Sequence, residues 1–123
     1  MMAFFKGEPA GGSVEELIHG ASADKVRLLL CVVNWGEVYY GMWRAGGKAA
    51  AEDVDRDLSR LPIELMDVGL QLTRQAAVYK AAHKMSYAGA FAAALAKEKN
   101  AELVTGDSEF QALKKEIKIQ WLT

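Results

Sequence analysis

Two acidic residues, Glu37 and Asp107, stand where acids could bind a metal ion. Glu37 comes a few residues after the apolar run LLLCVV (28–33), and Asp107 directly follows LVTG (103–106). If both runs are parallel strands, the two acids lie at one edge of the sheet, where open α/β sheets bind their ligands. Converging carboxylates repel each other unless a cation holds them together. Mg²⁺ is the usual cation, because it binds a few carboxylates and keeps its other positions for water and phosphate oxygens.

Each acid also has a purely structural interpretation. Glu37 is the last residue of Asn34-x-x-Glu37, a pattern that caps the start of a helix, and Asp107 could be the N-cap of the next helix. Taken singly, each acid is better explained by its cap. Their occurrence at the same predicted edge is what favours a shared metal site.

The elements that would position these acids alternate along the chain. Apolar runs predict strands, and capped amphipathic segments predict helices. Short connections between them favour an α/β fold with a parallel sheet flanked by helices. No repeat or low-complexity linker interrupts the pattern, so we expect a single domain over residues 1–123. We expect strands at 26–33, 63–68, 101–107 and 117–122, and helices at 14–20, 34–47, 48–60, 70–84, 86–100 and 108–116.

Composition restricts the partners and the compartment. The chain has 15 basic and 16 acidic residues, so any contact with nucleic acid must come from a local patch. The single cysteine, Cys31, lies inside an apolar run and is expected to be a buried, unreactive thiol in a reducing compartment. No apolar run approaches the ~20 residues of a membrane span, and no secretory signal pattern is present. We therefore expect a cytoplasmic protein.

Three segments together carry a family resemblance: VVNWGEVYYG (32–41), SYAGAFAAALAKEKNAELVTGDSEF (86–110) and IKIQWL (117–122). In order and spacing they resemble PIN-domain proteins, specifically the VapC-type toxins of toxin–antitoxin pairs. The likeness also includes FFKGEP (4–9) and extends over nearly the whole chain. It implies a three-layer fold around a central parallel sheet, and an endoribonuclease that depends on Mg²⁺ or Mn²⁺. It also implies homodimers, an RNA substrate and a partner antitoxin.

The resemblance assigns site residues one by one. Glu37 and Asp107 match acids that bind metal and act in catalysis in the family, and Asn34, Ser86 and Thr105 accompany them as supporting residues. Two family acids have no counterpart. Gly89 stands where the Ser86-capped helix would carry an Asp, and the first strand, with the Asp at its end, is missing before MMAFF.

These losses predict a weak or inactive nuclease, because two carboxylates hold Mg²⁺ loosely. Glu109, Glu102 and Asp67 are the nearby acids that could substitute, although Glu109 is explained well as a first-turn helix acid. The lost strand should leave 28–33 and 102–106 either to pair directly or to accept a strand from elsewhere. Of these we expect direct pairing or a rearranged dimer, unless the natural protein starts earlier. Three functions stay open: a metal-dependent ribonuclease, a degenerate PIN domain that binds RNA or an antitoxin, and a structural dimerisation remnant.

Other polar and aromatic residues are better explained by structure than by catalysis. His19 and His83 match no zinc-site spacing. Tyr39, Tyr40 and Trp43 could stack on bases, but a core face or a protein interface explains them better. Two small basic patches could contact phosphate, although ordinary solvated faces explain them as well; they are Lys80, His83 and Lys84, and Lys114, Lys115 and Lys118.

Overall fold

A computed structural model describes residues 4–6, 16, 18–20 and 27–122, with backbone only for residues 4–6. Its centre is a five-stranded sheet with strand order β3-β2-β1-β4-β5. Two parallel pairs, β2–β3 and β4–β5, flank the middle strand, which runs antiparallel to both of its neighbours. The strands are β1 (Phe4–Lys6), β2 (Leu28–Cys31), β3 (Ile63–Met66), β4 (Glu102–Thr105) and β5 (Lys118–Trp121). The α/β fold class is confirmed, but the sheet is mixed.

The middle strand corrects the expectation that this position is empty. β2 and β4 do not pair directly; β1 lies between them, with Phe5 opposite Leu29 on one side and Leu103 on the other. The physical reason is the cost of unpaired backbone groups along two buried strand edges. Because β1 is antiparallel, its last residue, Lys6, lies opposite the first residues of β2 and β4. Its carboxyl end therefore points away from the edge where β2 and β4 end.

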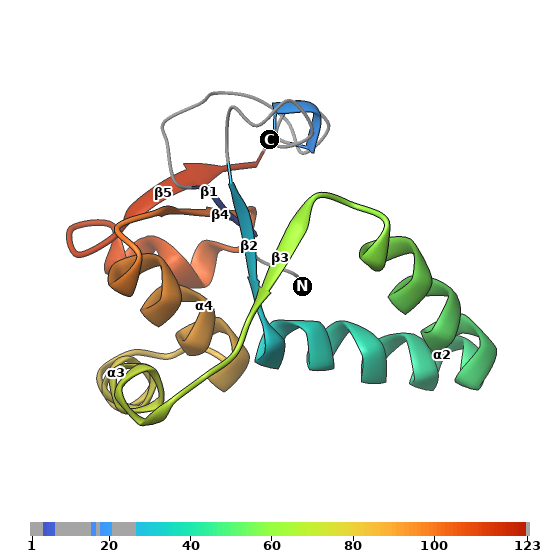
Figure 1. Cartoon of the computed structure of the whole chain (residues 1–123). Coiled ribbons are helices and arrows are strands. Elements are labelled where there is room, and N and C mark those ends of the chain that lie inside the picture. The colour runs from blue at the N-terminus through green and yellow to red at the C-terminus, as the bar shows by residue number, and fades with distance from the viewer. Residues whose placement is uncertain (1–3, 7–15, 17, 21–26, 123) are drawn as a thin grey trace.

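Helices cover the sheet and extend from it. They are α2 (Val32–Ser59), α3 (Leu70–Ala82) and α4 (Tyr87–Glu98), and a 3₁₀ helix, η1 (Ser108–Leu113), replaces the α-helix expected at 108–116. α3 and α4 pack against each other beside the sheet, whereas α2 projects away from it (Figure 1). The helix expected at 14–20 falls mostly outside the described residues, of which Glu16 and 18–20 are helical.

α2 is bent into two arms. The break lies at Gly47, whose φ of 81° is a left-handed conformation that glycine adopts without strain. This confirms the expected boundary between the helices at 34–47 and 48–60. After the bend, the second arm returns toward β3 (Figure 1).

The start of α2 differs from the expected cap. The helix begins at Val32, directly after β2, and its N-cap is Cys31, with no capping side chain. Asn34 is inside the first turn and is only 1% exposed. The proposed capping box of Asn34 and Glu37 is therefore wrong, because the chain passes from strand to helix without a connecting loop.

α4 forms the centre of the core. Every residue from Gly89 to Ala96 is buried, and the helix packs on β2, β4, α2 and α3. Small side chains permit this close approach, and Phe91 and Leu95 fill the remaining space. The tight packing fixes the N-terminal turn of α4 relative to the strand ends.

Candidate active site

The N-terminus of α4 holds two polar side chains from different elements. As predicted, Ser86 is the N-cap: its Oγ accepts a hydrogen bond of 3.0 Å from the Gly89 N–H. Above it lies the carboxylate of Glu109, from η1. The Ser86 N–H donates to Glu109 Oε2 and the Ser86 hydroxyl donates to Oε1. The donor–acceptor distance is 3.4 Å in both cases. Glu109 thus makes the contact with the N-cap N–H that, in a capping box, comes from the acid three residues after the N-cap.

Gly89 is the residue three positions after the N-cap. Because it has no side chain, the carboxylate of Glu109 can lie against the first turn of α4. A Cβ atom at position 89 would meet Glu109 Oε1, and it would lie 2.9 Å from Ser86 Oγ and 3.2 Å from Phe110 Cζ. These separations are closer than ordinary van der Waals contact, so a side chain at 89 and the present position of Glu109 exclude each other.

Asp107 lies between β4 and η1 and directly precedes the first residue of η1. Its Oδ1 accepts a hydrogen bond of 3.0 Å from the Glu109 N–H, so it is an N-cap. Its own N–H donates to Oγ1 of Thr105, a residue that is 1% exposed at the end of β4. The structural role expected for Asp107 is therefore present, and the same bonds hold its half-buried carboxyl group at the carboxyl edge of the sheet.

Asn34 connects the first turns of α2 and α4. Its Nδ2 donates a hydrogen bond of 2.9 Å to the carbonyl oxygen of Ala88, next to Gly89. The other amide atom, Oδ1, is buried and finds no hydrogen-bond partner among the described residues. A buried acceptor without a partner costs about 1–3 kcal/mol, unless a water molecule or an ion binds it. Glu37 lies about one turn further along α2 and is half-buried.

Three first turns therefore meet at the carboxyl edge, those of α2, α4 and η1. Carboxylate and amide oxygens are the donor types that Mg²⁺ and Mn²⁺ prefer, so the donor chemistry suits such an ion. Over residues 27–122 and the other described positions, however, no group of three or more acidic, histidine or cysteine side chains is arranged to hold a metal. The donors are of the right type, but they do not form a preassembled metal site.

The other acids considered as substitutes lie elsewhere. Glu102 is the first residue of β4 and pairs with Lys118, so it is at the opposite edge of the sheet from Asp107. Asp67 is exposed just beyond β3, the outermost strand on its side. Glu109 is the acid of the three whose carboxylate hydrogen-bonds to Ser86 at the start of α4.

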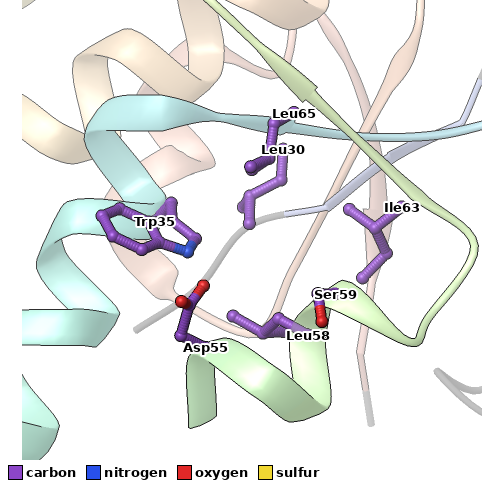
Figure 2. Close-up of a pocket in the computed structure, with 7 residues that line it drawn as sticks. All are labelled: Leu30, Trp35, Asp55, Leu58, Ser59, Ile63 and Leu65. Carbon is purple, nitrogen blue, oxygen red and sulfur yellow. The ribbon is translucent and has the colours of Figure 1, made fainter. Parts of the chain in front are cut away.

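A small cavity lies away from these residues. It has a volume of about 60 Å³ and lies between β2, β3 and the two arms of α2 (Figure 2). Trp35, Leu58 and Ile63 contribute apolar walls, and Asp55 adds a carboxylate. Neither Glu37, Asp107 nor Glu109 lines it, so this cavity is not part of the candidate site.

Aromatic side chains follow one another along the first arm of α2. Trp35 and Tyr39 stack with ring centres 5.1 Å apart, and Tyr39 is followed by Trp43 at 6.1 Å. Tyr40, 53% exposed, lies beneath the guanidinium of Arg44. Together these aromatic side chains form a partly exposed surface on the first arm of α2.

The first basic patch is partly structural. Lys80 donates a hydrogen bond of 2.6 Å to the carbonyl oxygen of Met85. This bond stabilises the connection that precedes Ser86.

Sequence reasoning considered Glu109 but assigned it to its own helix. Its contact with Ser86 joins residues 23 positions apart and depends on how η1 packs against α4. The one signal in the sequence is the glycine at position 89, where a capping box would have an acid. The side-chain contact of Asn34 with α4 has no comparable signal.

Comparison with known proteins gives one family match. The PIN domain family matches residues 1–116, which includes every residue of the candidate site. No curated protein and no solved structure shows significant similarity to the chain. Within the described residues, none of the helices combines the length and the apolar character needed to cross a membrane.

Proposed function

The chain belongs to the PIN domain family, and from that premise we propose that it is a VapC-type endoribonuclease with a reduced site. Nuclease activity is the general property of PIN domains, and they generally use divalent metals. The VapC relationship, the RNA substrate and the Mg²⁺ or Mn²⁺ dependence rest on the three sequence segments that resemble the toxins. The proposed site residues are Glu37 and Asp107, supported by Asn34, Ser86 and Thr105.

The carboxyl edge of the sheet supports this proposal most directly. Asp107 is fixed there by its bonds to Thr105 and to the Glu109 N–H. Glu37 and Asp107 would hold the ion, which when bound activates water and neutralises charge on the phosphate. Gly89 contributes no carboxylate, and the carboxyl end of β1 lies at the other edge. We therefore expect cleavage to be slow compared with a complete site.

A time course of RNA cleavage by the purified chain tests this function. We expect slow cleavage with Mn²⁺, none with a chelator, and a loss of about tenfold or more in Asp107→Asn and Glu37→Gln. Glu98→Gln is the matched control, because it removes a carboxylate at the far end of α4. Cleavage that is equal in Asp107→Asn and the control would contradict the assignment.

A second function, a degenerate PIN domain that binds a partner, is favoured by the exposed aromatic surface. Tyr40 and Trp43 are 53% and 46% exposed on the first arm of α2. Aromatic side chains are enriched where proteins meet, so this surface suits an antitoxin, an RNA or a second copy in a homodimer. A folded chain that binds such a partner and cleaves no RNA would favour this alternative. Either function is consistent with a cytoplasmic location.

A further inference from the structure

The small cavity between the arms of α2 contains a carboxylate with no cation beside it. The cavity leads inward from the surface, since Leu65 is 54% exposed whereas Leu30 is fully buried. The half-buried side chain of Asp55 is directed into this space (Figure 2). None of the described residues that line the cavity is basic. A carboxylate among apolar walls is stabilised when a cation pairs with it, so the cavity suits a cationic ligand.

Asp55 differs from the acids near it, which already have partners. The neighbouring pairs are Glu64 with Arg27, Asp53 with Arg56, and Glu52 with the Tyr39 hydroxyl. Asp55 accepts no hydrogen bond and forms no ion pair within the part of the chain that the structure describes. Burial raises the pKa of the Tyr39 hydroxyl, and the negative charges of Glu52 and Asp55 raise it further. The space between the arms is therefore negatively charged.

The size and the walls of the cavity fit the end of an arginine side chain. The volume is about 60 Å³. A bound water molecule needs about 10–15 Å³ of such volume, so the cavity has room for about four to six non-hydrogen atoms. A guanidinium group is planar and weakly hydrated, and it can donate two hydrogen bonds to one carboxylate. It therefore tolerates apolar walls such as Trp35, Leu58 and Ile63 better than the strongly hydrated ammonium group of lysine does.

We propose that this cavity binds the guanidinium group of an arginine that a partner protein presents, with Asp55 as its counter-ion. The guanidinium donates to the Asp55 carboxylate, and the methylene stem of the arginine packs against Leu65 at the entrance. The inference rests on the partner-binding function proposed above. It is independent of RNA cleavage, because neither Glu37 nor Asp107 lines the cavity.

Location and charge favour a protein over RNA or free arginine. Trp35 lines the cavity and also begins the partly exposed aromatic surface, so a protein bound to that surface can reach into the cavity. RNA would bring phosphate groups, which the charge of Asp55 repels. Free arginine has an α-carboxylate, and no described lining residue offers a cation to pair with it.

Nuclear magnetic resonance titration of the full chain with a blocked Gly-Arg-Gly tripeptide tests this site. The matched tripeptide has citrulline in place of arginine, which keeps the shape and removes the charge. We expect the arginine peptide to shift the indole N–H signal of Trp35 and the backbone amide signals of Asp55 and Ser59. The citrulline peptide should bind about tenfold or more weakly. A lysine peptide should also bind more weakly than the arginine peptide.

A matched pair of variants separates the cavity from general attraction to acids. Asp55→Asn keeps the shape of the side chain and should weaken binding of the arginine peptide about tenfold or more. Asp57→Asn is the control, because it removes an equal charge from an exposed position on the same arm, outside the cavity. It should bind the peptide as the unaltered chain does.

Several results would overturn the inference. Equal binding of the arginine and citrulline peptides would do so without any variant. Equal losses in Asp55→Asn and Asp57→Asn would show that binding follows net charge alone. Tighter binding of free arginine than of the arginine peptide would indicate a small-molecule site. Shifts confined to Tyr40 and Trp43 would overturn the inference and leave the partner-binding function standing, whereas the absence of any shift would contradict both.

Discussion

Adding one methyl group at two helical glycines tests the packing at the start of α4. In Gly41→Ala the new Cβ points into open space, whereas in Gly89→Ala it meets Glu109 Oε1 and lies 2.9 Å from Ser86 Oγ. Alanine is favoured over glycine inside a helix by about 0.5–1 kcal/mol. We expect Gly41→Ala to raise the free energy of unfolding by that amount.

Gly89→Ala should lose this gain. Displacing the Ser86 cap costs about 1 kcal/mol, and weakening the bonds from Ser86 to Glu109 costs up to about 1 kcal/mol more. We therefore expect Gly89→Ala to be about 1–2 kcal/mol less stable than Gly41→Ala, summing these contributions.

Urea unfolding followed by circular dichroism measures the difference. Truncating Glu109 removes the closest obstacle, so Gly89→Ala should be less damaging in a Glu109→Ala background than in the unaltered chain. Equal stabilisation by Gly89→Ala and Gly41→Ala would refute the placement of Glu109 against α4.

Two further predictions concern groups with shifted pKa values. Burial raises the pKa of the Cys31 thiol, so a thiol reagent should react with it only after the chain is unfolded in urea; fast reaction of the folded protein would contradict its place in the core. Hydrogen bonds from Arg27, of 2.9 and 3.0 Å, lower the pKa of Glu64 and join β3 to the residue before β2. A lowered pKa stabilises the fold above the ordinary pKa of a carboxyl group, and this contribution is lost as the pH falls through the lowered value. Since both side chains are more than half exposed, we expect Glu64→Gln to cost under about 1 kcal/mol at neutral pH and nothing in strong acid, by urea unfolding. An equal cost at both pH values would contradict the ion pair.

Local signals predicted much of the fold. The Ser86 cap and the break at Gly47 depend on the chemistry of residues near them in the sequence, so both could be predicted. The apolar runs likewise predicted β2, β3, β4 and β5, with ends within a few residues of the observed ones.

The features that could not be predicted from the sequence depend on tertiary contacts. β1 has three residues and no pattern of its own; its position is set by the facing edges of β2 and β4. Asn34 matches a cap pattern, but its amide contacts Ala88 on a different helix. The family resemblance identified two lost acids, yet only the structure brings Glu109 to the position that Gly89 leaves open.

The most direct test of the proposed site is to locate bound Mn²⁺ by nuclear magnetic resonance. Paramagnetic broadening of backbone amide signals reports which residues lie near the ion. We predict that substoichiometric Mn²⁺ broadens the signals of Gly89, in the first turn of α4, and of Gly106 and Asp107, which connect β4 to η1. Signals near Glu98 should stay sharp. Broadening confined to the exposed acids of the second arm of α2, such as Asp53, or no localised broadening, would contradict a metal-dependent site at this edge of the sheet.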